Sequence, residues 1–393
     1  MFANKAAFLA QLNQLNSSCQ VVHAFSCANT QAWSLHNFID KFDHLVKTVT
    51  SIGEDGVRFG YKASAEQFAP NTLLRFGIEA EQAGFDSVWV SDHFQPWKHT
   101  DGHAPFALSW IPALLAKTER VVVGTSVLTP TFRLHPSVVA HAFGTLGSMF
   151  PGRVILGVGT GESLNEVPST GIVWPELKER SARLREAVAL IRRLWSEDRV
   201  SFDGDYYKTQ NATIYDKPEQ MVPIYLAAGG PLNAKYAGRA GDGFICTSGK
   251  GAELYVDQLL PNVAAGRAES PLAGQPFERM IEVKVSFDTD HERALNDTRG
   301  WAALSLSAEE KHSVEDPEEM ERLAAQLPIE RIAKRWIVSS DPEEHVRSIQ
   351  TYIDYGFDHL VFHAPGNDQS RFLSLYAEHI LPRLHKIAAE RQG

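Results

Sequence analysis

The sequence predicts an α/β fold, a (β/α)8 TIM barrel, in which eight parallel strands alternate with helices. Eight short apolar and β-branched runs recur along the chain, as is typical of parallel strands that are buried on both faces. Helical patterns separate several of these runs, and a doubly wound sheet is the alternative arrangement. The runs are residues 57–61, 87–90, 121–128, 154–158, 222–226, 243–246, 280–287 and 359–362.

The clearest helical pattern spans residues 174–195. Its apolar residues recur at helical spacing, while glutamate and arginine occupy most positions between them. This pattern predicts an amphipathic helix with one face packed on the barrel. The predicted stripe consists of Leu177, Leu184, Val188, Ile191 and Trp195.

The composition suits one large catalytic domain. The chain has 393 residues, of which 44% are hydrophobic, so it can bury a large core. Residues 1–56 lack the strand pattern and contain two modest amphipathic stretches. We therefore expect a loosely ordered N-terminal extension at 1–56 and a single TIM-barrel domain at 57–393.

The charge and the cysteines exclude several classes of protein. The net charge is −10, because 48 acidic residues outnumber 38 basic ones, so neither a nucleic-acid nor a membrane partner is expected. No run is long enough to span a membrane, and none has the pattern of a signal peptide. Cys19, Cys27 and Cys246 form neither a disulfide framework nor a metal-ligand spacing. We expect a cytoplasmic protein without a metal site.

Polar segments follow most of the predicted strands, for example residues 62–66 after the first. In a barrel these segments share the face on which active sites form. The segment 91–97 is the most distinctive, because Asp92, His93 and Trp97 follow directly after a strand. The alternative interpretation is a turn in which Asp92 caps the next helix.

Two ionisable groups could exchange protons at this face. One is His93, because the imidazole of an unperturbed histidine can take up a proton at neutral pH, and the other is Glu162, which follows the glycine-rich segment 157–161. We expect Glu162 to lie on a dry floor that raises its pKa, and a structural glutamate is the alternative. The segment lacks the G-x-G-x-x-G pattern, which disfavours a nicotinamide fold.

Other strand ends could bind an anion. Gly229 and Gly230 precede Pro231, a residue that suits the first turn of a helix, and free amides there could hold a phosphate. Tight turns are the alternative explanation for such glycines. Lys250 follows a strand, whereas spacing alone assigns Lys311 and Arg335 only to solvated helix faces.

These segments together resemble the F420-dependent glucose-6-phosphate dehydrogenases, a branch of the bacterial-luciferase-like superfamily. The resemblance runs from about residue 59 to 383 and does not include the first 56 residues. The specific motifs include GYKASAEQFAP (60–70), VSDHFQPW (90–97), GTSVLTPTF (124–132), GVGTGE (157–162), AAGGP (227–231), AKRWIV (333–338) and HLVFHAPG (359–366).

The resemblance implies a TIM barrel with luciferase-like loop insertions, a homodimer, and a role in carbohydrate metabolism. It implies oxidation of glucose 6-phosphate to 6-phosphogluconolactone, with hydride transfer to the deazaflavin coenzyme F420. The residues implied to line the coenzyme are Asp92, Ser126, Val127, Thr129, Thr160, Gly161, Asn165, Gly229 and Gly230, with a cis peptide between Ser126 and Val127. The implied phosphate ligands are Thr247, Lys250, Lys311 and Arg335.

His93, Trp97 and Glu162 are implied to surround the reacting carbon. We assign His93 as the base and Glu162 as the acid, and the reverse assignment stays open. Three alternatives remain: an F420-dependent dehydrogenase of another sugar or an alcohol, a luciferase-like FMN monooxygenase, and a non-catalytic coenzyme or phosphosugar carrier. The loop at 167–170 is one residue shorter than the family's form, so contacts with the coenzyme's polyglutamate tail are undefined.

Overall fold

The structure is a computed structural model, and it describes residues 56–307, 309–311 and 314–391. These described residues belong to one compact unit. The expected N-terminal extension lies outside the described residues apart from Gly56, so its loose attachment stays a prediction.

Eight parallel strands close into a barrel, which confirms the predicted TIM-barrel class. Each strand pairs with the next, and the pairings β8–β9 and β11–β1 complete the ring, which excludes the doubly wound sheet. The ring strands are β1 (Arg58–Ala63), β2 (Ser87–Val90), β3 (Val122–Thr125), β4 (Val154–Val158), β7 (Ile224–Ala227), β8 (Gly243–Thr247), β9 (Glu278–Phe287) and β11 (His359–His363).

Side chains from these strands alternate between the inside of the barrel and the layer beneath the helices. Trp89, Tyr225 and Met280 belong to a small buried cluster contributed only by ring strands. The neighbouring Phe59 and Val88 instead join the large core that includes helix residues. The strands are therefore buried on both faces, which explains their continuous apolar sequence.

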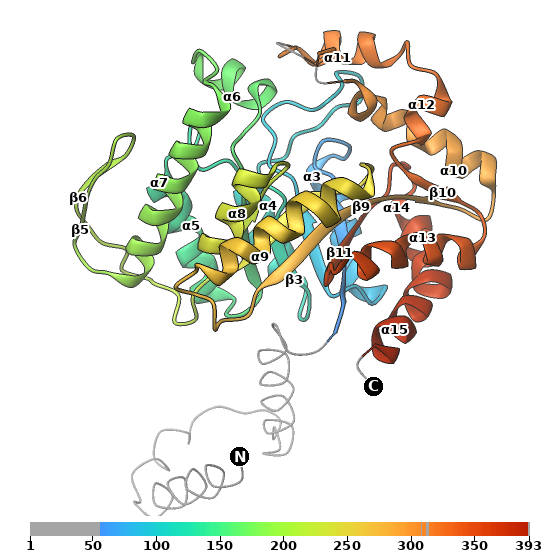
Figure 1. The fold of residues 1–393 in the computed structure, drawn as a ribbon. Helices are drawn as coiled ribbons and strands as arrows, with labels where there is room; N and C mark the ends of the chain where they lie inside the picture. The colour runs from blue at the N-terminus through green and yellow to red at the C-terminus, as the bar shows by residue number, and fades with distance from the viewer. Residues whose placement is uncertain (1–55, 308, 312–313, 392–393) are drawn as a thin grey trace, which may run out of the picture. The chain divides into compact units, whose positions relative to one another are not determined.

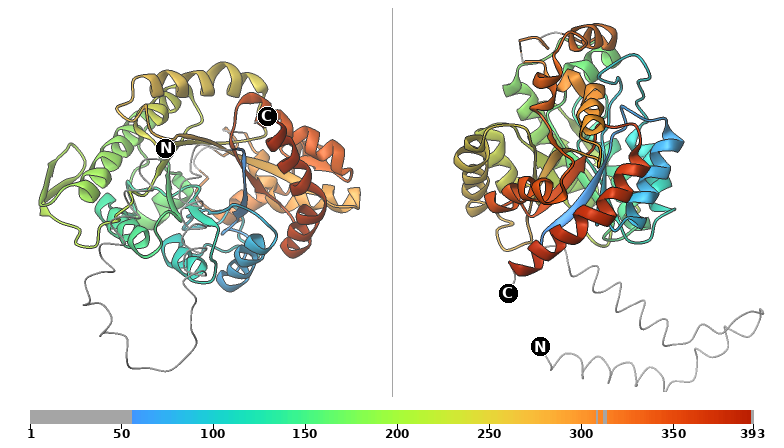
Figure 2. Two further views of the ribbon diagram at one scale, coloured as in Figure 1. Left: turned by 90° about the horizontal axis from the view of Figure 1, so that it is seen from below. Right: turned by 90° about the vertical axis from the view of Figure 1, so that its right-hand side faces the viewer.

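Helices form the outer layer around the strands (Figures 1 and 2). The helices are α3 (Pro70–Gln82), α4 (Ala107–Leu115), α5 (Pro136–Met149), α6 (Ser163–Thr170), α7 (Leu177–Ser196), α8 (Pro231–Ala240), α9 (Leu260–Ala268), α10 (His291–Asp297), α11 (Pro317–Ala324), α12 (Ile329–Ala333), α13 (Pro342–Tyr355), α14 (Gln369–Leu375) and α15 (Leu381–Glu390). Shorter helical segments are η1 (Leu254–Leu259), η2 (Thr298–Ser305) and η3 (Tyr376–Ile380).

The amphipathic helix is α7, and one member of its predicted stripe is wrong. Leu184, Val188 and Ile191 are buried as expected, and so is Trp195. Leu177 is 51% exposed instead. It is the first residue of α7, where the helix has not yet reached the barrel core.

Two small additions were not predicted from the sequence. An antiparallel hairpin of β5 (Val200–Asp203) and β6 (Lys208–Ala212) projects beside α7, at the left of Figure 1. Glu186 of α7 accepts hydrogen bonds from the backbone amides of Tyr206 and Tyr207, which joins the hairpin to the helix. The short β10 (Ile337–Ser339) pairs with β9 outside the ring. The β5 and β6 sequences mix polar and apolar residues and are mostly not buried, and β10 is only three residues long.

No helix among the described residues is long and apolar enough to cross a membrane. In the same part of the chain, no three His, Cys, Asp or Glu side chains gather in a way that could hold a metal ion.

Candidate active site

The loop after β2 brings His93 between two glutamates. Its Nε2 lies 3.2 Å from an oxygen of Glu66 and 3.9 Å from an oxygen of Glu162. The structure therefore brings the predicted pair His93 and Glu162 together and adds a third group. Glu66 follows β1, in the segment that the sequence placed on this face without a role.

Glu66 is the buried acid of this group, and Ser91 donates a 2.5 Å hydrogen bond to it. Burial alone would raise the pKa of Glu66, but His93, Lys62 and the bond from Ser91 outweigh burial and lower it. Ionised Glu66 therefore places a negative charge 3.2 Å from Nε2 of His93.

The expected dry surroundings of Glu162 are wrong. Its side chain is 50% exposed, compared with 6% for Glu66. Glu162 is the residue directly before α6, so it lies at the rim of the site, where glycine neighbours cannot cover it.

Trp97 connects the acid–base group to a cation. Its ring centroid lies 5.7 Å from that of His93. The ammonium of Lys311 lies 5.1 Å from the centroid of the same ring, a cation–π arrangement. The predicted phosphate ligand Lys311 therefore approaches the predicted catalytic residues.

The side chains of Asn165 and Asp92 already have protein partners. Oδ1 of Asn165 accepts hydrogen bonds from the amides of Phe94 and Gln95, which holds the loop that carries His93. Asp92 accepts a 2.7 Å hydrogen bond from Arg133. It also accepts one from the first backbone amide of α4, which is the contact expected if Asp92 caps the next helix. Their contacts with a coenzyme stay a prediction.

The ends of β3, β4 and β7 lie side by side and carry the other predicted coenzyme residues. The Ser126–Val127 peptide is cis, as the resemblance implies. Lys62 donates 2.6 Å hydrogen bonds to the carbonyl and the hydroxyl of Ser126. Gly161 has φ +82°, and a Cβ there would lie 2.9 Å from Thr129, so this turn requires glycine. Thr160 precedes it in the same loop.

The glycines before α8 face open space. A Cβ added to Gly229 or Gly230 would meet no atom within 4 Å. Pro231 starts α8, so the free amides of its first turn lie directly after this opening. A ligand could approach the backbone closely here, and an anionic group would suit the helix N-terminus.

The three predicted cations form a cluster of like charges. In the described part of the chain, none of Lys250, Lys311 and Arg335 has a carboxylate within ion-pair distance. Burial lowers the pKa of Lys250, and Arg335 lowers it further. A cluster of uncompensated cations at a site rim is suited to a multiply charged anion.

Among the three cations, Lys311 has the pKa that departs most from its usual value. Burial is the main cause that lowers its pKa to about 8. Glu162 raises this pKa, whereas Arg335, Lys250 and Lys284 lower it by repulsion. Because such interactions weaken quickly with distance, these effects indicate that Lys311 lies near the other two cations and Glu162.

A buried charge network contacts Thr247 through Lys284, and no pattern in the sequence indicates it. Glu282 of β9 contacts Lys62 at 3.3 Å, Lys284 at 3.1 Å and His363 at 3.2 Å. Burial would raise the pKa of Glu282, but these partners lower it well below its usual value. Lys284 also donates a hydrogen bond to the hydroxyl of Thr247.

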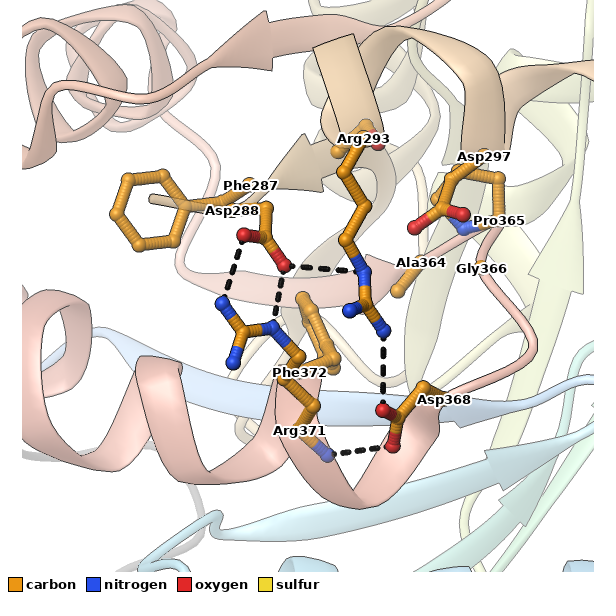
Figure 3. Close-up of a pocket in the computed structure, with 11 residues that line it drawn as sticks. Phe287, Asp288, Arg293, Asp297, Ala364, Pro365, Gly366, Asp368, Arg371 and Phe372 are labelled. Carbon is orange, nitrogen blue, oxygen red and sulfur yellow. Dashed lines mark hydrogen bonds and ion pairs between the residues drawn. The ribbon is translucent and has the colours of Figure 1, made fainter. Parts of the chain in front are cut away.

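A separate pocket lies next to the ends of β9 and β11 (Figure 3). Arg371 donates to Asp288, and Arg293 donates to Asp368. The hydrogen bond from Arg371 is the main cause that lowers the pKa of Asp288 to about 2. These ion pairs occupy the pocket's centre and join α10 to α14, so we interpret it as a structural junction.

The comparison with known proteins agrees with this geometry. The model of the luciferase-like monooxygenase family matches residues 56–359. An F420-dependent glucose-6-phosphate dehydrogenase from Amycolatopsis mediterranei is 60% identical over 331 residues, which cover 84% of this chain and 99% of that protein. The chain belongs to the F420-dependent glucose-6-phosphate dehydrogenases of the luciferase-like family.

Other members of this family match equally well. The F420-dependent glucose-6-phosphate dehydrogenase of Mycobacterium tuberculosis is 60% identical over 333 residues, 84% of this chain and 99% of that protein. Among solved structures, an F420-dependent secondary alcohol dehydrogenase in complex with an F420–acetone adduct has a TM-score of 0.78 and 34% identity. That match covers 84% of this chain and 99% of the other.

Proposed function

We propose that this protein oxidises glucose 6-phosphate to 6-phosphogluconolactone and transfers the hydride to coenzyme F420. The observation that carries the proposal is the position of the cation cluster beside the acid–base group. Lys311 contacts the ring of Trp97, and Trp97 packs on His93. A phosphate on the cations therefore brings the rest of a sugar phosphate to His93.

The cluster also separates this substrate from its nearest rival. An uncharged sugar or a secondary alcohol would leave Lys250, Lys311 and Arg335 unpaired at the site. A phosphate dianion would instead satisfy several donors through charge-assisted hydrogen bonds. The Thr247 hydroxyl at the end of β8 would add one more donor.

The residues at the ends of β3, β4 and β7 fit the implied coenzyme. Ser126, Val127, Thr129, Thr160 and Gly161 would lie along it, and the opening before α8 at Gly229 and Gly230 suits its phosphate. When bound, coenzyme F420 supplies a two-electron hydride acceptor. Asp92 and Asn165 would support this surface mainly by holding the adjoining loops.

In the proposed mechanism, His93 takes the proton of the sugar's C1 hydroxyl as C1 loses its hydride. Ionised Glu66, 3.2 Å from Nε2, stabilises the imidazolium that forms. Trp97 places a ring against the same imidazolium, which adds a favourable cation–π contact. Glu162 lies at the exposed rim, where it can take up a proton from solvent. As the acid, it would supply the proton that the coenzyme needs when it accepts the hydride.

The direct test follows the absorbance of oxidised F420 after glucose 6-phosphate is added. We expect the deazaflavin band to disappear with one lactone formed per coenzyme, and a secondary alcohol to give no comparable rate. Oxygen uptake with reduced FMN would instead identify a luciferase-type monooxygenase. Binding of both ligands without any absorbance change would identify a carrier.

We also propose that the protein is a cytoplasmic homodimer that acts in carbohydrate metabolism, with neither a nucleic-acid nor a membrane partner. The net charge of −10 supports the last two points. The family resemblance supports the dimer.

The lowered pKa of Lys311 predicts how substrate affinity depends on pH. Its charge is present below about pH 8 and is lost as the pH rises through that value in the free enzyme. We therefore expect the KM for glucose 6-phosphate to rise between roughly pH 7 and pH 9. Measuring KM across this range tests the prediction, and Lys311→Gln should remove most of the rise. A profile that is identical in the variant would contradict it.

A further inference from the structure

Lys284 is a buried cation that the mechanism above does not use. It lies near the end of β9, and only 4% of its side chain is exposed. Its ammonium donates to Glu282 at 3.1 Å and to the Thr247 hydroxyl. It is therefore the one described lysine that contacts both the buried network and a proposed phosphate ligand.

The bond to Lys284 determines what Thr247 can offer a ligand. An ammonium has only donors, so the Thr247 oxygen must accept this bond. The hydroxyl hydrogen is then directed away from Lys284 and remains free to donate. Thr247 is exposed at the mouth of the site, where an acceptor such as a phosphate oxygen can approach.

The surroundings hold Lys284 in this position. Lys284, Lys62 and His363 keep the pKa of Glu282 well below its usual value, so the carboxylate under Lys284 stays negative. The backbone amide of Lys284 donates a 2.8 Å bond to the Ser248 hydroxyl, and the amide of Ser248 donates to the carbonyl of Glu282. The ends of β8 and β9 are thus joined directly below Thr247.

We propose that Lys284 is a fourth cation of the phosphate site. It orients the Thr247 hydroxyl and adds positive charge on the side of Thr247 that faces the buried Glu282 network. Lys284 is a positioning residue in this proposal, because its reach to the phosphate passes through Thr247. The inference rests on the proposed function. Lys284 also lowers the pKa of Lys311, as Arg335 and Lys250 do, which agrees with a position close to the other cations.

The test compares Lys284→Met with the parent enzyme in the full chain with F420. We expect the KM for glucose 6-phosphate and the inhibition constant of inorganic phosphate each to rise about tenfold. The dissociation constant of F420, measured by fluorescence, and the KM for unphosphorylated glucose should change less than about twofold. Lys386→Met, on the exposed face of α15, is the control and should match the parent.

A double variant tests whether Lys284 acts through Thr247. Adding Lys284→Met to Thr247→Val should raise the KM for glucose 6-phosphate by less than the product of the two single effects. If Lys284→Met unfolds because Glu282 loses a partner, Lys284→Met combined with Glu282→Gln removes both charges and permits the same measurements.

The outcomes separate this inference from the proposed function. No reduction of F420 by glucose 6-phosphate in the parent enzyme would remove the proposed function itself. A working parent whose Lys284→Met variant keeps its KM and its phosphate inhibition would remove only the role of Lys284. An equal rise in KM for glucose and for glucose 6-phosphate would show a general structural effect of Lys284→Met and would also overturn the proposed role of Lys284.

Discussion

Replacing His93 with alanine is expected to lower kcat by about 10²–10⁴-fold, while F420 affinity stays nearly unchanged. The imidazole lies 3.2 Å from Glu66, and no other described imidazole contacts this carboxylate. Without the imidazole, the C1 hydroxyl proton would have to pass to water or to a glutamate. The loss should therefore fall on turnover and leave binding largely intact.

Steady-state rates and coenzyme fluorescence titration check this expectation together. His99→Ala is a matched control, because His99 is 65% exposed six residues further on in the same loop region. Glu66→Gln should give an intermediate loss of kcat, since it keeps the shape of the side chain but removes the negative charge beside the imidazolium that forms during the reaction. An unchanged kcat in His93→Ala would exclude His93 as the base, and Glu162 would become the candidate.

Removing one cation of the phosphate cluster should raise the KM for glucose 6-phosphate by about one to two decades. A charge-assisted hydrogen bond contributes roughly 1.5–3 kcal/mol, and 1.4 kcal/mol corresponds to a factor of ten. The variants are Lys250→Ala, Lys311→Ala and Arg335→Ala. Turnover at saturating substrate should fall less than KM rises, because the phosphate is bound alike in the ground state and the transition state.

The decisive measurement is the KM of each variant for glucose 6-phosphate and for glucose. The KM for glucose should rise little in any of the variants, because glucose has no phosphate for the cations to bind. Lys334→Ala is the control, since Lys334 is exposed and directly precedes Arg335 in the chain. Equal losses for both sugars would show that these cations do not bind the phosphate, and the substrate assignment would be wrong.

The barrel was predictable because its signal is local. Each ring strand is a buried apolar run, and such runs stand out in the sequence without any knowledge of their partners. The β5–β6 hairpin has no such run because its strands are partly exposed, and the run at β10 is only three residues long. Leu177 was misplaced because the pattern cannot show where α7 leaves the core.

The candidate site was predictable only in part. The position of His93 after β2 followed from the pattern alone, whereas the grouping of the three cations came from the family resemblance. The environment of Glu162 depends on how the loop enters α6, which spacing does not encode. The contacts of Glu66 and Lys284 depend on the register between neighbouring strands, so no single segment indicates them.

The closure of the barrel has a consequence for how the chain folds. β1 pairs with β11, and the side chains of Arg58 and His359, 301 residues apart, lie 3.1 Å from each other. Because β11 is the last ring strand in the chain, the ring cannot close until almost all of the domain has been synthesised. Until then β1 and β9 present unpaired edges, which can associate with other chains. A nascent chain that stops before β11 should therefore depend on chaperones far more than the finished protein does.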